Sequence, residues 1–158
     1  MSRWYYILQA VLKFFTQTIE RPSPSDIVPV SAVKVEGDTI KINLKALNIP
    51  FSLTPRVWIP LIPGTNSMDG AFDYGNNNIL IAGADATDHE VMIDFIEVGD
   101  VVVYNSPSRD CAIIHRIIQK GEDAEGRWFR FKGDNNASAD PEKVRDSQIK
   151  WLSIGTIY

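Results

Sequence analysis

Cysteine and basic charge are both in short supply in this sequence, and each shortage excludes a class of protein. One cysteine, Cys111, stands among 158 residues, so an internal disulfide and a cysteine-based metal cluster are excluded. We interpret Cys111 as a small buried residue on a strand. The 16 basic and 20 acidic residues give a net charge of −4, whereas a nucleic-acid-binding domain normally carries a concentrated basic surface. We therefore expect no nucleic-acid partner.

Histidine is scarce as well. The two histidines, His89 and His115, are far apart in the sequence and lack the spacing of metal ligands. The acidic group Asp85, Asp88 and Glu90 is interpreted as solvated surface rather than as a calcium site. We expect His89 to lie at the surface with them. The sequence therefore predicts neither a metal nor a cofactor.

The sequence also lacks an apolar run of the roughly 20 residues that a membrane-spanning helix needs. Residues 1–20 nevertheless carry apolar side chains at positions 4, 5, 8, 11, 12 and 15, which is helical spacing. No small-x-small cleavage site follows them, as it would in a secretory signal. We predict a short amphipathic helix over residues 1–20. Two placements of its apolar face are open, against protein or in a membrane interface, so we expect the protein to be membrane-associated or soluble.

The remainder of the chain is typical of a mainly β protein. Residues 21–27 form a proline-containing linker, and residues 28–158 a single domain in which turn residues separate short apolar or alternating runs. These runs predict strands at 33–35, 40–44, 56–62, 79–81, 101–104, 111–118, 127–132 and 149–158. Many short strands of this kind are typical of a partly open barrel or coiled sheet.

Two segments of the domain have a more specific interpretation. Glu36-Gly37-Asp38 is predicted to be the turn of a hairpin, and Pro60 and Pro63 make 56–62 an edge or irregular strand. Residues 82–97 are polar and acidic. We interpret them as an insertion that leaves the sheet as a surface excursion, with a short helix near 90–96.

Candidate chemistry begins at Ser67, which lies in the turn-rich stretch 64–72. A nucleophilic serine needs an exposed hydroxyl, which a glycine-containing turn provides, and a base within reach. His115 is a candidate base, although a histidine within an apolar strand is more often structural. Asp134 and Asp140 follow the predicted strand 127–132, and either could orient an imidazole by accepting its second ring proton.

Taken in order, these motifs resemble the type I signal peptidases, most closely their archaeal and endoplasmic-reticulum branch. The likeness covers roughly residues 61–158. It rests on Ser67-Met68, then Val98–Tyr104, Ile114–Ile118 and Lys132–Asn136. The resemblance implies a fold shared with the repressor-type proteases, and an activity in which an extended preprotein segment is cut after small residues at the first and third positions before the cut.

The resemblance also implies a role for each matching residue. Ser67 would be the nucleophile and His115 the base, at the position where the bacterial branch has lysine. Asp140 lies six places beyond Asp134, the offset at which the family carries its second aspartate. We therefore expect Asp140 to orient His115 and Asp134 to be a supporting acid. Thr65 and the backbone N–H of Ser67 would hold the oxyanion.

This chain departs from the family pattern in its nucleophile turn and in its length. Met68 would be the buried neighbour that sets the turn, but Gly70 stands where the family usually has proline. We expect this glycine to loosen the turn. The 82–97 segment also lengthens the interval from serine to histidine.

Two other functions are compatible with the sequence. A self-cleaving repressor-type protease would use a lysine base and an Ala-Gly bond ahead of the serine, whereas Ala82-Gly83 follows Ser67 here. A non-catalytic binding or assembly module on the same fold would be compatible with the departures at Gly70 and in residues 82–97. The expected partners are a preprotein or peptide and, through residues 1–20, a membrane surface.

Overall fold

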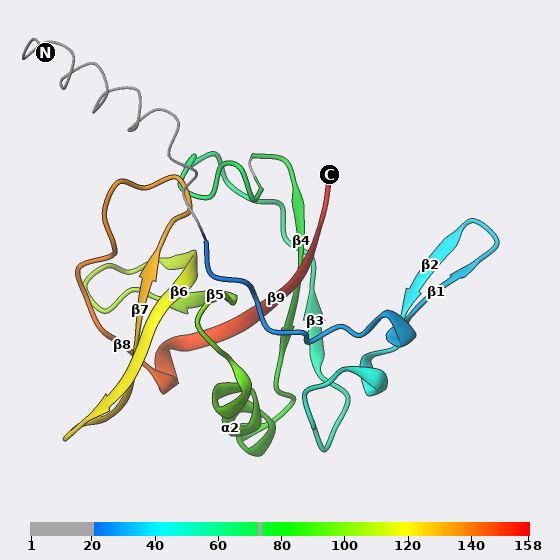
Figure 1. Ribbon diagram of the computed structural model, residues 1–158, viewed down its shortest axis with the longest axis horizontal. Coiled ribbons are helices and arrows are strands. Elements are labelled where there is room, and N and C mark those ends of the chain that lie inside the picture. The colour runs from blue at the N-terminus through cyan, green and yellow to red at the C-terminus, as the bar shows by residue number, and fades with distance from the viewer. Residues whose placement is uncertain (1–20, 73) are drawn as a thin grey trace, which may run out of the picture.

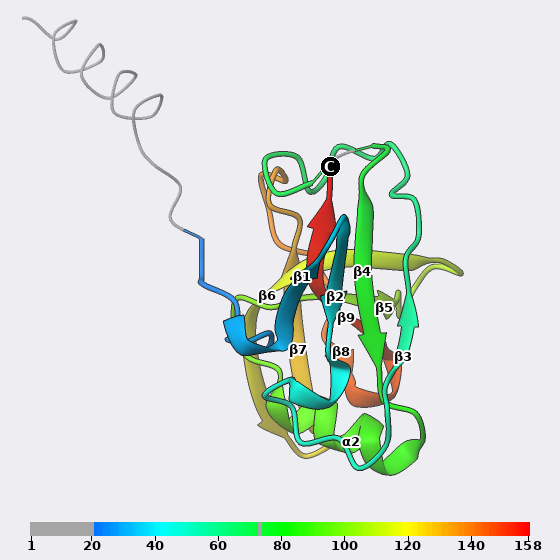
Figure 2. The same ribbon diagram turned by 90° about the vertical axis from the view of Figure 1, so that its right-hand side faces the viewer.

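A seven-stranded antiparallel sheet forms the body of the molecule in the computed structural model, which describes residues 21–72 and 74–158 (Figure 1). The strands are ordered β3-β4-β9-β5-β6-β7-β8. Their bounds are β3 Arg56–Trp58, β4 Asn77–Ala82, β5 Val101–Asn105, β6 Ala112–Asp123, β7 Gly126–Lys132, β8 Val144–Arg145 and β9 Ile149–Ile157. The sheet coils around its core and stays open (Figure 2). The predicted mainly β, partly open architecture is confirmed.

The predicted hairpin is present beside this sheet. β1 (Val33–Glu36) pairs with β2 (Thr39–Ile42), so that Glu36 faces Thr39 across the turn. Gly37 takes a φ of +63° there, a conformation that favours glycine. The expectation of an edge strand at 56–62 is also confirmed, because β3 ends the sheet and stops before Pro60.

A continuous apolar core lies on the concave side of the coiled sheet. Alternation along the central strands sends one set of side chains into it. Its fully buried members come from β4, β5, β6, β7 and β9 and from the helix described next; they include Ile81, Val102, Tyr104, Ile117, Phe129, Phe131, Ile149 and Leu152. This core fixes the strand register on which the candidate site depends.

The 82–97 segment contributes to this core, so its interpretation as a surface excursion is wrong. Helix α2 spans Ala86–Phe95, longer than the predicted 90–96. Its Met92 and Ile93, with Ile96 just beyond it, are buried in the core. Three large apolar side chains at helical spacing are sufficient to hold a short helix against a sheet.

The interpretation of Asp85, Asp88 and Glu90 as solvated surface is wrong for Asp88, whereas Asp85 and Glu90 are exposed. Asp85 caps the helix by accepting from Asp88 N at 2.9 Å. Asp88 is buried and accepts from Ser52 N, Ser52 Oγ and Leu53 N at 2.8, 2.7 and 3.1 Å. Burial acts to raise the pKa of Asp88, but these hydrogen bonds outweigh it and hold the pKa below its usual range. The carboxylate therefore ties α2 to the loop before β3.

The expectation of a surface position for His89 is also wrong, because α2 brings this side chain against β9. His89 is partly buried, and its Nε2 lies 3.0 Å from the carbonyl oxygen of Ile149 on β9. It therefore has a structural contact on α2, at a distance from the loops around Ser67.

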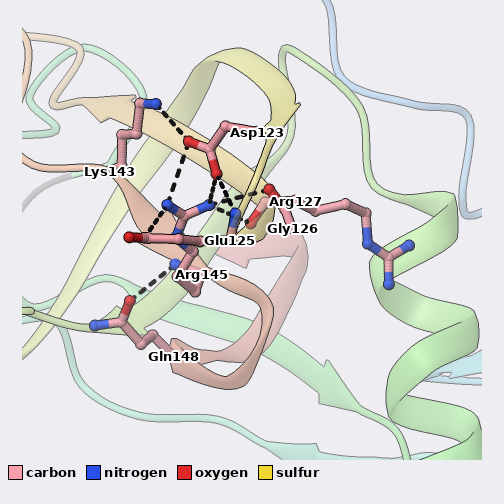
Figure 3. Close-up of polar contacts among 7 residues, drawn as sticks. All are labelled: Asp123, Glu125, Gly126, Arg127, Lys143, Arg145 and Gln148. Carbon is pink, nitrogen blue, oxygen red and sulfur yellow. Dashed lines mark hydrogen bonds and ion pairs between the residues drawn. The ribbon is translucent and has the colours of Figure 1, made fainter.

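A polar network lies at the turn of the β6–β7 hairpin, where β6 ends at Asp123 and β7 begins at Gly126 (Figure 3). Arg145 of β8 donates to Asp123 Oδ1 and to Glu125, at 2.8 and 2.7 Å, and Lys143 donates to Asp123 Oδ2 at 2.7 Å. The hydrogen bonds from Arg145 and then Lys143 hold the pKa of Asp123 below its usual range. Arg127 points the other way, toward α2.

The predicted linker, residues 21–27, contacts the domain: Ser25 N and Oγ donate to the two carboxylate oxygens of Asp100, at 2.7 and 2.9 Å. A Cβ on Gly99 would lie 1.9 Å from Ser23 O, so only glycine fits beneath the linker. The helix predicted for residues 1–20 lies outside the described residues. Along the described part of the chain, no helix is both long and apolar enough to cross a lipid bilayer.

Candidate active site

Three segments line a cavity of about 420 Å³. Two of them, the loops after β3 and β7, lie at the end of the sheet away from α2 (Figure 2). The loop after β3 contributes Thr65 and Ser67, the first half of β6 contributes His115, and the loop after β7 contributes Asp140. Asp134 does not line the cavity. Four of the five predicted site residues therefore share one concave surface, which is where binding and catalytic sites are usually found.

Cys111 also lines this cavity, just before β6, and its side chain is exposed. The prediction of a buried Cys111 is therefore wrong. The strand begins at Ala112, one residue later than the apolar run suggested, so Cys111 belongs to the turn that leads into β6.

The loop that carries Ser67 (residues 62–72) is a closed turn built on a buried methionine. Met68 is 3% exposed and packs with Ile62 and Phe72, and Met68 O accepts from the backbone N–H groups of Ala71 and Phe72 at 3.0 and 3.1 Å. Gly70 takes a φ of +89° within it, a conformation that favours glycine. The glycine therefore permits the turn, and the geometry does not support the expectation that it loosens it.

The Lys-Gly-Asp-Asn-Asn stretch (residues 132–136) holds the loop that carries Ser67 from the other side. Asn135 N donates to Ser67 O, and Asn135 Nδ2 donates to Asn66 O, both at 2.9 Å. A Cβ on Gly133 would lie 2.5 Å from Ser67 O, so a side chain at that position would displace the loop. These contacts explain why glycine and an amide follow β7.

The serine hydroxyl has a hydroxyl neighbour. Ser67 Oγ lies 3.2 Å from Thr65 Oγ1, and the Ser67 side chain is half-buried. Asn66, between them, takes a φ of +60°, which is uncommon for a residue with a side chain. This left-handed residue turns both hydroxyls to the same side of the loop.

His115 is buried in the wall of the cavity, with 6% of its surface exposed. Its Nδ1 lies 2.7 Å from Asp140 Oδ2. When Nδ1 carries the proton and donates it to the carboxylate, Nε2 is left as the basic nitrogen. In the described part of the chain, no hydrogen bond joins Ser67 Oγ to His115. Such bonds are often long in a site without substrate and tighten when it binds.

Asp140 is held at three points. Its backbone N–H donates to Phe131 O at 2.8 Å. Its Oδ2 accepts from His115 Nδ1 and from Tyr104 Oη, both at 2.7 Å. Burial acts to raise the pKa of Asp140, but the hydrogen bonds from His115 and Tyr104 outweigh it and lower the pKa below its usual range. Asp140 is therefore an anion at neutral pH.

Asp134 has a different partner. Arg116 Nε and Nη2 donate to its two carboxylate oxygens at 2.8 and 2.6 Å, and Arg116 Nη1 donates to Gly99 O at 2.6 Å. Asp134 N also contacts Met68 Sδ at 3.4 Å. The two acids thus lie in different surroundings: Asp140, which was expected to orient His115, contacts it, and Asp134, the expected supporting acid, forms a bidentate ion pair beneath the loop that carries Ser67.

Tyr104 is the residue near this site that the sequence analysis missed. It lies at the end of the buried strand β5 and was interpreted there only as part of the apolar pattern. The only signal in the sequence is that a tyrosine in such a run carries a hydroxyl, which needs a hydrogen-bond partner when it is buried.

Comparison with known proteins gives matches to signal peptidases. The chain is 44% identical over 104 residues to the signal peptidase complex catalytic subunit sec11 of Neurospora crassa, covering 60% of this chain and 52% of the relative. It is 46% identical over 52 residues to SEC11 of Fusarium vanettenii, covering 33% and 30%. Signal peptidase I W of Bacillus subtilis is 30% identical over 86 residues, covering 54% and 41%.

These matches confirm the resemblance to the type I signal peptidases, including its endoplasmic-reticulum branch. The chain spans between about a third and a half of the length of the three relatives described. No family model matches the chain.

Proposed function

We propose that this chain, which resembles the type I signal peptidases, is a serine endopeptidase of the same kind. Its substrate would be an extended segment of a preprotein with small residues at the first and third positions before the cut. The observation that carries the proposal is the meeting of two pairs, Ser67 with Thr65 and His115 with Asp140, in one cavity.

In the proposed mechanism, Ser67 Oγ attacks the scissile carbonyl carbon while His115 Nε2 takes the hydroxyl proton. Asp140 accepts from Nδ1 throughout, so it fixes the ring and stabilises the imidazolium. The oxyanion receives hydrogen bonds from Thr65 Oγ1 and the backbone N–H of Ser67. Collapse expels the amine, which takes the proton from Nε2. A water molecule then repeats the sequence on the acyl-enzyme, releasing the acid and restoring Ser67.

The cavity suits an extended apolar segment. Ile62 and Pro63 line it on one side, and Ala112 to Ile114 of β6 line it on the other. A peptide laid between two such segments can bond to main-chain groups and place alternate side chains in the cavity. We place the encounter with substrate at a membrane surface, with the apolar face of residues 1–20 as the contact.

A second candidate, a non-catalytic binding module, is favoured by one observation. Ser67 Oγ bonds to Thr65 rather than to His115 among the described residues. In this alternative the cavity binds an extended segment without cutting it.

Cleavage of a synthetic preprotein peptide, with alanine at the two positions named above, separates the two candidates. We expect Ser67→Ala to lower the turnover number by at least about 1,000-fold, because it removes the hydroxyl that forms the acyl-enzyme in the proposed mechanism. Ser138→Ala, in the exposed loop after β7, is the matched control and should retain full activity. Equal rates for Ser67→Ala and the parent protein would rule out the proposed activity.

A further inference from the structure

Tyr104 and His115 project from the same face of the sheet. In the antiparallel pairing of β5 with β6, Val102 lies opposite His115 and Tyr104 lies opposite Ile113. Directly opposed residues of neighbouring strands share a face, as do residues two apart on one strand. Phe131 joins this face because it lies opposite Ile117 in the pairing of β6 with β7. The register alone therefore brings the phenol beside the imidazole.

The ring of Tyr104 is held firmly. It is 2% exposed and stacks on Phe131 with ring centroids 4.3 Å apart and planes 19° from parallel. Phe131 also accepts the backbone N–H of Asp140. One aromatic residue thus fixes both the ring that carries the hydroxyl and the backbone of the acid, so the distance between phenol and carboxylate is set by the fold.

Both donors meet at one carboxylate oxygen. Asp140 Oδ2 accepts from Tyr104 Oη and from His115 Nδ1, each at 2.7 Å. A carboxylate on a loop, held by a single donor, can rotate and exchange its oxygens. A second donor on the same oxygen removes that freedom and leaves Oδ2 aimed at the imidazole.

We propose that Tyr104 is a positioning residue for the His115–Asp140 pair: its hydroxyl holds Asp140 Oδ2 where that oxygen meets His115 Nδ1. The inference rests on the proposed function for its catalytic meaning, whereas the hydrogen-bond coupling itself is independent of activity. The core needs only the ring at this position, since the stacking on Phe131 would survive loss of the hydroxyl.

The protonation state of the Tyr104 hydroxyl supports its role as a positioning residue. Burial, and then the hydrogen bond to Asp140, raise the pKa of Tyr104 far above its usual range. The phenol is therefore protonated, and able to donate, at neutral pH. Two other charged groups act on the pair: Glu142 further raises the pKa of Tyr104, and Arg109 acts to lower the pKa of both Tyr104 and Asp140.

Tyr104→Phe tests the proposal because it removes one oxygen atom and keeps the ring. We expect a fall in kcat of about 10-fold, with KM for the peptide unchanged, since the hydroxyl orients the base and does not touch substrate. We also expect the acid limb of the pH profile of kcat/KM to move to higher pH. Asp140 would lose one of the hydrogen bonds that lower its pKa, and its unshared charge would favour a proton on the imidazole.

Proton NMR of His115 gives a readout that needs no catalysis. In Tyr104→Phe the Nδ1–H resonance should move downfield, because its acceptor oxygen is no longer shared. Incorporation of fluorotyrosine at position 104, a stronger O–H donor, should move this resonance and the acid limb in the opposite direction. If the protein cleaves no peptide, the proposed function fails and the NMR result alone decides the coupling.

Ser153→Ala is the matched control, because it removes a hydroxyl that donates to Asn78 Oδ1 at 2.5 Å, on β9 and outside the cavity. It should change neither the acid limb nor the His115 resonance. The proposal is overturned if Tyr104→Phe leaves the resonance unmoved. It is also overturned if the variant loses only stability, with the acid limb in place, since that result would assign Tyr104 a packing role.

Discussion

The ion pairs at the two ends of the seven-stranded sheet differ in their exposure to solvent. At the cavity end, Asp134 is paired with Arg116 in a largely buried contact, and Asp140 with His115. At the α2 end, Arg127 bonds to Glu90, Asp94 and Asp146 (η3, Asp146–Gln148); Glu90 and Asp94 are largely exposed and Asp146 is partly exposed. Figure 3 shows the neighbouring network of Asp123, Lys143 and Arg145, whose side chains are partly exposed.

This difference in exposure suits the ion pairs at the two ends to different roles: placing a few side chains at the cavity end, and holding secondary-structure elements together at the α2 end. Exposed ion pairs are screened by water and salt and contribute little each, although several together hold a hairpin against a helix. Buried pairs have lost their hydration, so removing one partner is costly and their geometry is strongly determined. We infer that the cavity end is built for close placement of a few groups, and the α2 end for fastening elements together.

The largest expected effect is that of Asp140→Asn. The amide is similar in size, but it cannot stabilise an imidazolium and can favour the wrong tautomer of His115. We expect kcat for the peptide to fall by about 1,000-fold or more, with a small change in melting temperature. Peptide cleavage and a thermal melt on the same preparation check both expectations.

The pH dependence of that melt provides the control. Because the pKa of Asp140 is lowered in the folded protein, its stabilising contribution is complete above the unfolded value of about 4 and is lost as pH falls through the lower folded value. The asparagine variant has no such contribution, because its amide does not titrate. The difference in melting temperature between parent and variant should therefore narrow in acid, and a difference that widened would contradict the assignment.

Asp134→Asn should show the opposite balance. It leaves Arg116 buried with half of its bidentate acceptor, so we expect unfolding to become easier by about 3 kcal/mol. The fraction that remains folded should keep more activity than Asp140→Asn does. Chemical denaturation monitored by tryptophan fluorescence measures the loss. Equal activity losses in the two variants would remove the distinction between the two acids.

Met92→Ala tests support at the other end. Met92 is fully buried where α2 meets the sheet, and truncation to alanine in such a place costs about 2 to 5 kcal/mol. We expect kcat per folded molecule to stay at the parent value, because α2 and the cavity lie at opposite ends of the sheet. Denaturation and active-site-normalised kinetics measure the two quantities. A drop in kcat without loss of stability would contradict this expectation and show that α2 influences the cavity across the sheet.

Arg127→Gln should have the smallest effect. Its three ion pairs are partly or largely exposed, so we expect a loss of about 1 kcal/mol at low salt. The loss should shrink in 1 M NaCl, where the screening length falls to about 3 Å. A loss that did not depend on salt would indicate that Arg127 acts through packing of its side-chain stem.

The predictable part of the fold came from strand periodicity. Strands near Val101–Tyr104 and Arg127–Lys132 are visible in the sequence because one or both of their faces are buried. Helix α2 was underestimated because its apolar residues are few and its acids resemble a solvated loop. The burial of Asp88 depends on donors 35 and 36 residues away in the sequence, which no local pattern records.

The candidate site, like the fold, could be predicted from the sequence only in part. The order of motifs brought Ser67, His115 and the two acids together as candidates, and only the six-residue offset implied by the family resemblance favoured Asp140 over Asp134 as the partner of His115. What separates them is Arg116, which engages one acid and leaves the other to the imidazole. The Tyr104 hydroxyl could not be placed from the sequence either, since its contact with Asp140 depends on the register of β5 and β6 and on the loop after β7.

The most direct test of the account is covalent labelling of Ser67 by a serine-directed phosphonate, followed by intact mass and peptide mapping. The account predicts one adduct per molecule, located on Ser67, that is lost in Ser67→Ala and forms far more slowly in His115→Ala. An unlabelled protein, or a label of equal rate in His115→Ala, would contradict the claim that His115 activates Ser67.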